Sequence, residues 1–292
     1  MLREAEQDIR RVDEKVGAAV VGVGSRGPVG SGVVVAPGRV VTNAHNVHDE
    51  GVTITFGDGR AETGAVSGVD VDGDVAVVGV DTGEIEPVEW SDATPSIGTP
   101  VVALANPGGR GLRVTIGFVS GAERTFRGPR GRRISGAIEH TAPLLPGSSG
   151  GPVVDLDGRL LGLNTHRLGE GFYLAIPAVP DLRQRIDALA GGEAPTRLRL
   201  GVAVVPGFVA RRMRRAVGLP DTAGVLVRSV DEGGPADRAG LSQGDLIVAV
   251  GGRPVAGIDE LHAALDSAAE GEPLPLRVLR GVDEIELAVD FG

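Results

Sequence analysis

The sequence predicts a mainly β protein, with an antiparallel barrel or pair of barrels followed by a smaller domain of mixed strands and helices. Short β-branched runs separated by turn signals follow one another from about residue 17, with no intervening helices. The 47 glycines and 19 prolines are spread along the whole chain, which suits many short strands joined by tight turns. After residue 197, strands alternate with two helical stretches, a pattern typical of a helix packed against a small sheet.

Composition limits the classes of function. The 292 residues are enough for two domains with buried cores, and the mean hydropathy of +0.09 argues against disorder. The net charge of −10, from 29 basic and 39 acidic residues, argues against nucleic acid as the main partner. Because the chain contains no cysteine, the sequence excludes disulfides, thiolate zinc sites and cysteine nucleophiles.

No window is long and apolar enough for a signal peptide or a bilayer span, which predicts a soluble chain with no membrane segment. We expect it in the cytoplasm as the sequence stands. If a signal or anchor segment has been removed, we expect it in the cell envelope or periplasm.

The predicted elements follow in order along the chain. Apolar residues recur at three- and four-residue steps over residues 2–16, which predicts a short amphipathic helix. Nine apolar runs then predict strands, at 18–23, 32–36, 52–56, 75–80, 100–105, 114–120, 151–156, 160–165 and 172–177.

The second half begins with a predicted helix over residues 180–190, with Leu182, Ile186 and Leu189 on one face. GGEAPT (191–196) has the composition of a linker. We therefore divide the chain into an N-terminal helix or leader (1–16), a first domain (17–180), a helix and linker (181–197) and a second domain (198–292).

The stretch PGSSGGP (146–152) places two serines between glycines and prolines. A tight glycine turn that exposes a hydroxyl beside converging N–H groups is what a serine nucleophile with an oxyanion hole needs. A glycine–serine loop with no catalytic role has the same composition. The presence or absence of the other triad residues must therefore decide between the two.

A serine nucleophile needs a base and a carboxylate that orients the base. His45 follows the strand-like run GRVVT and so has the placement of a base, whereas we assign His48, His166 and His262 to the surface. Asp74 opens the apolar run DVAVVGV, which holds its backbone. Two other aspartates, Asp70 and Asp72, lie just before it in GVDVDG (68–73), and for this segment we predict a solvated turn.

Eight motifs, in this order and spacing, resemble the HtrA/Deg family of trypsin-fold serine proteases with C-terminal PDZ domains. They are GSGVVV (30–35), TNAH (42–45), GDVAVV (73–78), ANPGG (105–109), GFVSG (117–121), GSSGGP (147–152), LNT (163–165) and LAIP (174–177). The resemblance covers nearly the whole chain beyond residue 20. It implies a chymotrypsin/trypsin-like double β-barrel followed by a small α+β PDZ domain.

The resemblance also implies roles for individual residues. His45 matches the family's catalytic histidine, Asp74 its aspartate, and Ser149, directly before Gly-Gly, its serine. The backbone N–H groups of Gly147 and Ser149, with Ser148 between them, would form the oxyanion hole.

The serine loop departs from the usual family sequence. Thr141, Leu145 and Ser148 replace an aspartate and two asparagines, and these lost polar groups affect how the loop is held. By resemblance, Leu144 lines the pocket for the residue before the cut, and Tyr173 replaces a glycine at the same wall. We expect a shallow apolar pocket for small aliphatic side chains; an obstructed resting pocket is the alternative.

The second domain resembles a PDZ domain, most specifically in AGLSQGDLI (239–247). A PDZ domain adds a peptide as a strand to a sheet edge and holds its terminal carboxylate in a nest of N–H groups. That nest maps to Leu200, Gly201 and Val202.

The arginine-rich stretch 123–133 is a solvated loop on composition alone, whereas the family places a sensor loop there. We expect one or more of its arginines to make a switch contact to the PDZ domain or to a neighbouring subunit. These arginines are Arg124, Arg127, Arg130, Arg132 and Arg133.

The leading interpretation is an ATP-independent serine endopeptidase that cleaves unfolded or misfolded polypeptides and is regulated by C-terminal peptides bound to its PDZ domain. The alternative is a catalytically silent peptide-binding scaffold or chaperone, which the altered serine loop leaves open. An α/β-hydrolase would need its serine between a strand and a helix, whereas GSSGG lies among strands.

No metal, nucleotide or other cofactor site is apparent. A homotrimer is implied by the resemblance alone, because residues 1–20 lack the aromatics that family members often use.

Overall fold

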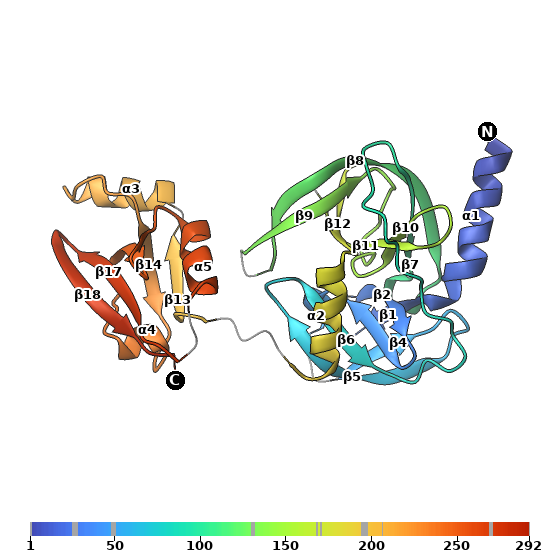
Figure 1. Ribbon diagram of the computed structural model, residues 1–292, viewed down its shortest axis with the longest axis horizontal. Helices are drawn as coiled ribbons and strands as arrows, with labels where there is room; N and C mark the ends of the chain where they lie inside the picture. The colour runs from blue at the N-terminus through green and yellow to red at the C-terminus, as the bar shows by residue number, and fades with distance from the viewer. Residues whose placement is uncertain are drawn as a thin grey trace. The chain divides into compact units, whose positions relative to one another are not determined.

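The computed structural model describes residues 2–24, 29–47, 51–129, 132–167, 169, 171–193, 198–205, 207–268 and 271–291. The chain divides into two compact units, Met1–Pro195 and Thr196–Gly292 (Figure 1). In the described part of the chain, the first unit holds two closed six-stranded barrels and the second a six-stranded sheet, which confirms the predicted fold class. His48, Arg130 and linker residues 194–197 lie outside the described residues.

The first barrel contains the strands that precede the predicted base and carboxylate. All its strand pairs are antiparallel, and its strands close in the order β1-β2-β3-β6-β5-β4. Valines such as Val33, Val41 and Val77 are at most 1% exposed, so the β-branched runs are explained by burial in the core that the two barrels share. The strands are β1 (Val20–Gly24), β2 (Val29–Ala36), β3 (Arg39–Thr42), β4 (Gly51–Thr55), β5 (Ala61–Asp70) and β6 (Val75–Gly79).

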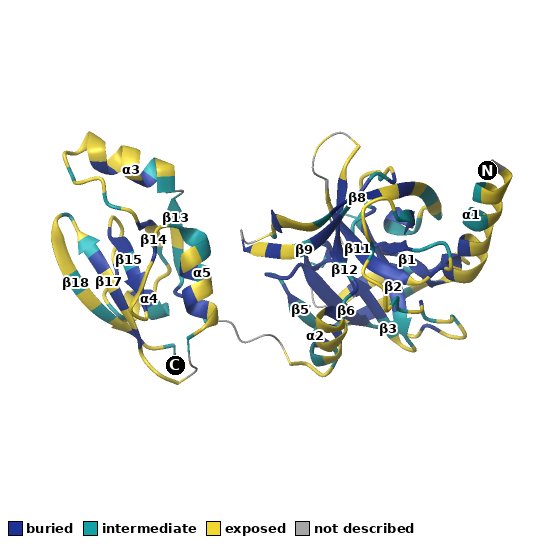
Figure 2. Ribbon diagram, turned by 45° about the horizontal axis from the view of Figure 1, so that its top comes forward, coloured by how far each residue is buried: buried dark blue, intermediate teal, exposed yellow. Residues whose placement is uncertain are grey.

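The second barrel carries the serine turn between two of its strands. Its strands close in the order β10-β11-β12-β9-β8-β7, again with antiparallel neighbours. One apolar core runs through both barrels, and buried residues are concentrated on their strands (Figure 2). The strands are β7 (Pro100–Ala105), β8 (Arg113–Arg127), β9 (Arg133–His140), β10 (Pro152–Val154), β11 (Leu160–Arg167) and β12 (Tyr173–Pro177).

Two helices pack on the barrels as their periodicity predicts. Helix α1 (Leu2–Val16) buries Val12 and Val16 in the core shared by the barrels. Helix α2 (Pro180–Ala190) lies against β5 and β6 and buries the predicted face of Leu182, Ile186 and Leu189. Most of the other residues of α1 are exposed (Figure 2).

The second unit has a core of its own, built from its sheet and the helix α5 (Ile258–Asp266). The strand order is β13-β14-β15-β17-β18, with β16 paired to β15. The remaining elements are β13 (Val202–Val205), α3 (Gly207–Ala216), β14 (Val225–Val230), α4 (Pro235–Arg238), β15 (Leu246–Val250), β16 (Arg253–Pro254), β17 (Leu274–Arg280) and β18 (Asp283–Val289).

The prediction of a solvated turn at GVDVDG is wrong. Asp70 and Asp72 are 3% and 7% exposed. Asp70 accepts from the N–H of Gly73 at 2.9 Å and lies 3.6 Å from a guanidinium nitrogen of Arg185. Asp72 lies 3.4 Å from Nε of Arg132, which is itself 8% exposed. The arginine-rich stretch therefore contributes one buried cation to the loop before β6, because a buried carboxylate needs a charged partner.

His140, at the end of β9, is a fully buried histidine. Its Nε2 lies 3.0 Å from Oδ1 of Asn164, while its Nδ1 is buried without a hydrogen-bond partner among the described residues. Because an amide oxygen only accepts, Nε2 carries a proton, whereas Nδ1 has no acceptor for a second one among the described residues. Burial lowers the pKa of His140 to about 4, and the hydrogen bond to Asn164 opposes this shift.

We expect His140 to make the stability of the first unit pH-dependent. Below pH 6.5 the unfolded chain binds a proton at this ring, whereas the folded protein resists protonation until about pH 4. The free energy of unfolding should therefore fall with pH, by about 2 kcal/mol between pH 7 and pH 5 from this group. Urea unfolding at both pH values, in wild type and His140→Gln, measures it. Equal pH dependence in the two proteins would contradict the assignment.

Candidate active site

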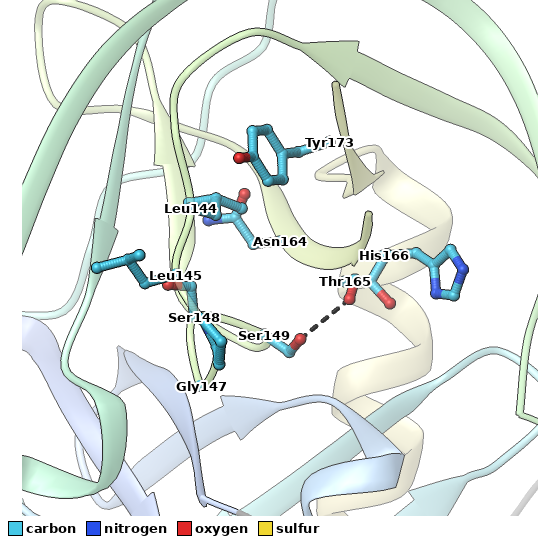
Figure 3. Close-up of a pocket in the computed structure, with 10 residues that line it drawn as sticks. Leu144, Leu145, Gly147, Ser148, Ser149, Asn164, Thr165, His166 and Tyr173 are labelled. Carbon is cyan, nitrogen blue, oxygen red and sulfur yellow. Dashed lines mark hydrogen bonds between the residues drawn. The ribbon is translucent and has the colours of Figure 1, made fainter. Parts of the chain in front are cut away.

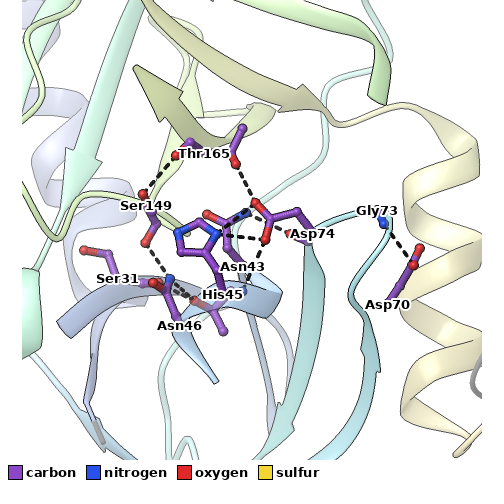
Figure 4. Close-up of polar contacts among 10 residues, drawn as sticks. Ser31, Asn43, His45, Asn46, Asp70, Gly73, Asp74, Ser149 and Thr165 are labelled. Carbon is purple, nitrogen blue, oxygen red and sulfur yellow. Dashed lines mark hydrogen bonds and ion pairs between the residues drawn. The ribbon is translucent and has the colours of Figure 1, made fainter. Parts of the chain in front are cut away.

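Four segments bring the candidate residues together, two from each barrel (Figure 4). His45 lies in the short 3₁₀ turn η2 (Ala44–Asn46) that follows β3, and Asp74 directly precedes β6. Ser149 lies in the turn before β10, and Thr165 lies on β11. Because β3 and β6 are hydrogen-bonded neighbours, the end of one and the start of the other lie side by side.

The imidazole of His45 is held by the carboxylate of Asp74. Its Nδ1 lies 2.8 Å from Oδ1 and 3.0 Å from Oδ2 of Asp74, and its backbone N–H donates to Oδ1 at 3.2 Å. A carboxylate only accepts, so Nδ1 carries a proton, and in the neutral ring the lone pair is on Nε2. His45 is therefore the tautomer that a general base requires.

Asp74 is 2% exposed and has a third donor from the second barrel. The hydroxyl of Thr165 donates to Oδ2 at 2.6 Å. The backbone of Asp74 is left-handed, with φ of 55°, and its carbonyl accepts from the side-chain amide of Asn43 at 2.9 Å. A non-glycine residue in this region is uncommon and is held there only by its surroundings.

The hydroxyl of Ser149 donates to the backbone carbonyl of Thr165 at 3.0 Å. Within the described residues, no hydrogen bond joins Oγ of Ser149 to the ring of His45. Such bonds are often long or misaligned in proteins without substrate. Ser149 is connected to the surroundings of the base through Asn46 and Thr165, and its hydroxyl is directed to an acceptor other than the imidazole.

The turn around Ser149 leaves alternate N–H groups unpaired. The N–H of Ser148 donates to Leu145 O at 3.1 Å, and that of Gly150 to Asn164 O at 2.7 Å. Among the described residues, the intervening N–H groups of Gly147 and Ser149 donate to no acceptor. Unpaired N–H groups beside a nucleophile are what an oxyanion hole requires.

Glycine is required at two positions of this turn. Gly147 and Gly150 both have φ of 87°, a region that favours glycine. A Cβ on Gly147 would lie 2.8 Å from Cβ of Pro107, and one on Gly150 would lie 2.1 Å from the carbonyl oxygen of Ser31. Gly150 therefore allows the turn to contact β2 of the first barrel directly, and Gly147 allows its close approach to Pro107, which follows β7.

A pocket of about 160 Å³ opens beside Ser149 (Figure 3). Leu144 and Tyr173, both predicted to form its wall, line it, and Tyr173 stacks on His140 with ring centroids 5.9 Å apart. Sequence reasoning did not assign five of the lining residues to the site: Leu145, Pro146, Asn164, Thr165 and His166. The full lining is Leu144, Leu145, Pro146, Gly147, Ser148, Ser149, Asn164, Thr165, His166 and Tyr173.

His166 was assigned to the surface, and it is indeed exposed, but it also lies at the pocket. Its ring stacks on Phe126, with centroids 6.1 Å apart. Thr165 was also missed as a residue of the active site. Its place in the LNT motif was visible, but its bond to Asp74 depends on how the barrels dock, and its bond to Ser149 on how the second barrel closes.

In the second unit, the predicted carboxylate nest lies just before β13. Leu200 is buried in the core, Gly201 has φ of 73°, and Val202 begins the strand. In the described structure, the N–H groups of Leu200 and Gly201 donate to no acceptor, while their carbonyls accept from Ala236 and Asp231. These two N–H groups are therefore unpaired donors in the described part of the chain.

Neither unit gathers a group of three or more His, Asp or Glu side chains suited to a metal ion among the residues described. No helix in the described ranges is both long and apolar enough to cross a membrane.

Residues 30–163 match the trypsin-like peptidase domain family and residues 226–280 match the PDZ domain family. Over 89% of its length, the chain is 32% identical both to a probable periplasmic serine endoprotease DegP-like of Chlamydia trachomatis and to a putative serine protease HhoA of Synechocystis. It covers 53% of the former and 69% of the latter, and spans about half the length of the first curated relatives.

A solved structure of an HtrA-type protease, AlgW with a tripeptide, has 26% sequence identity and a TM-score of 0.64, covering 97% of this chain and 96% of that one. The two matched domains, the curated relatives and this solved structure agree. The chain belongs to the HtrA/Deg family of trypsin-like serine proteases with a PDZ domain.

Proposed function

We propose that the protein is a serine endopeptidase that cleaves unfolded or misfolded polypeptides without ATP. The observation that carries the proposal is the imidazole of His45, held at 2.8 Å by the buried carboxylate of Asp74, which Thr165 connects to Ser149. In these roles Ser149 is the nucleophile, His45 the general base and acid, and Asp74 the group that orients the ring.

The first half of the reaction forms the acyl-enzyme. The hydroxyl of Ser149 turns from Thr165 O to Nε2 of His45, which takes its proton as Oγ attacks the scissile carbonyl carbon. The imidazolium then donates that proton to the leaving amine as the C–N bond breaks. Water, deprotonated by His45, attacks the acyl carbon in the second half and releases Ser149.

The negative charge on the carbonyl oxygen needs donors that are already in place. The N–H groups of Gly147 and Ser149 take this role, with Ser148 between them. Their lack of other acceptors supports the assignment, since donors aimed at the developing charge need not reorganise during the reaction.

The pocket supports a preference for small aliphatic side chains before the cleaved bond. Leu144 and Tyr173 form apolar walls around a volume of about 160 Å³. Such a site accepts an extended chain segment, which an unfolded polypeptide offers and a folded domain does not. The tripeptide of AlgW belongs to that protein's structure, and supports peptides as the ligand class here.

The second unit supports regulation by peptides with a free C-terminus. Unpaired N–H groups at Leu200 and Gly201 suit a terminal carboxylate, and the edge strand β13 suits an added peptide strand. As in the DegP-like relatives named periplasmic, we place the protein in the cell envelope. A homotrimer remains an expectation from the family.

A second candidate is a peptide-binding scaffold that keeps the fold without cleaving. The bond from Ser149 to Thr165 O, instead of to His45, favours it. The two candidates differ in whether Ser149 reacts.

A serine-directed fluorophosphonate probe should label the wild-type protein and fail to label Ser149→Ala. Cleavage of an unfolded protein such as casein should fall about 10⁴-fold or more in that variant, because the triad acts as a unit. Ser148→Ala is the matched control, and it should keep the label even if its rate changes. Absence of labelling in wild type, with and without a PDZ-binding peptide, would favour the scaffold.

Leu144→Ala should widen the pocket and shift its preference. We compare kcat/KM for a substrate with leucine before the cut with kcat/KM for one with alanine there. The leucine-to-alanine ratio should rise about 10-fold, since each additional methylene that a pocket accommodates changes kcat/KM by about that factor. A panel of fluorogenic peptides that differ only at this position measures the ratio. An unchanged ratio would show that the bound side chain does not enter this pocket.

A peptide with a free terminal carboxylate should bind more tightly than the same peptide carrying a terminal amide, by about 10-fold or more, because the amide removes the charge that the N–H nest binds. Fluorescence anisotropy on the whole chain gives both dissociation constants. Equal affinities would rule out the nest at Leu200 and Gly201.

A further inference from the structure

The hydroxyl of Ser31 connects the first barrel to the serine turn of the second. Ser31 lies on β2 and is fully buried. Its Oγ donates to the carbonyl of Gly147 at 2.8 Å and accepts from the N–H of Asn106 at 3.0 Å. Because Asn106 supplies a hydrogen, the hydroxyl proton of Ser31 is directed to Gly147.

The backbone of Ser31 holds the same turn at a second point. Its N–H donates to the carbonyl of Ser149 at 2.9 Å, and the side-chain amide of Asn46 donates to that carbonyl at the same distance. The carbonyl of Ser31 in turn accepts from the hydroxyl of Thr42 at 2.6 Å. Every polar group of Ser31 is therefore used, and two of them hold the turn.

These bonds fix alternate peptide planes of the turn. The 147–148 peptide is held by Ser31 at its carbonyl and by Leu145 O at its N–H. The 149–150 peptide is held by Ser31 and Asn46 at its carbonyl and by Asn164 O at its N–H. The 148–149 peptide between them is held at its own carbonyl by the N–H of Gly151 at 3.1 Å. Each peptide is planar, so the two flanking planes and this bond together set the direction of the N–H of Ser149.

We propose that Ser31 is a positioning residue that orients the oxyanion-binding N–H groups from the opposite barrel. It acts through Gly147 and Ser149 and does not touch the substrate. The inference rests on the proposed function, because it assigns Ser31 to the same reaction.

The hydroxyl is the part of Ser31 that this role needs. Without it, the buried N–H of Asn106 and the carbonyl of Gly147 both lose a partner. Gly147 tolerates both signs of φ, so the 147–148 peptide is then able to rotate. That rotation changes the backbone angles at Gly147 and Ser148 and misdirects the donors on either side.

Ser31→Ala tests the role against a matched control, Thr82→Val. Thr82 is also buried, at 2% exposed, and its hydroxyl accepts from the N–H of Gly38 in the first barrel, with no bond to the turn. Each substitution removes one buried hydroxyl. Both proteins are assayed with a fluorogenic peptide and with a peptide boronic acid, whose adduct with serine places an oxygen among the oxyanion donors.

In Ser31→Ala we expect kcat to fall about 10- to 100-fold while KM changes less than about 3-fold, because donors act on the transition state. The inhibition constant of the boronic acid should rise by a factor similar to the loss in kcat. In Thr82→Val neither quantity should change beyond about 3-fold, although both variants lose stability in urea unfolding.

If Ser31→Ala fails to fold, Ser31→Cys keeps a side chain of similar size with a weak donor, and should lie between wild type and the expected alanine value. Equal kcat in Ser31→Ala and Thr82→Val, or wild-type kcat in a folded Ser31→Cys, overturns the inference. Both results leave the proposed function intact, because wild-type Ser149 still reacts with the fluorophosphonate. A wild-type protein that does not react overturns the two together.

Discussion

The buried carboxylate of Asp74 is the interaction on which the rest of the site depends. It accepts from the ring and the backbone N–H of His45 in the first barrel and from the hydroxyl of Thr165 in the second. A carboxylate that is 2% exposed is stable only where charge-assisted bonds replace its hydration. Docking of the barrels and orientation of the imidazole therefore occur together.

The turn around Ser149 is held in a different way. Its contacts to the first barrel are made by backbone groups, through Ser31 and Asn46, and it approaches so closely that Gly150 has no room for a Cβ. Charge sets the direction of the base, whereas neutral hydrogen bonds and the absence of side chains set the path of the nucleophile turn. The carboxylate lies directly before β6, whereas the bonds to the nucleophile turn come from β2 and from the turn η2 that follows β3.

Much of the fold follows from local pattern, and the exceptions have a common cause. The β-branched runs and the helix faces of α1 and α2 appear where periodicity places them. Strands β5 and β9 were missed because glycine and charged residues interrupt their apolar alternation. Asp70 and Asp72 resembled a solvated turn, since their partners Arg185 and Arg132 lie far away along the chain.

The sequence by itself determined the fold class, the family motifs and the candidate trio His45, Asp74 and Ser149, because residue type and placement at strand ends are local properties. It did not determine that Thr165 bonds both Asp74 and Ser149, that Ser31 holds the serine turn, or that Asn164 meets the buried ring of His140. Tertiary structure decided these contacts. Some join segments of one barrel that meet only when its strands pair, and the others join segments that meet only when the two barrels pack. Residue spacing along the chain does not specify either approach.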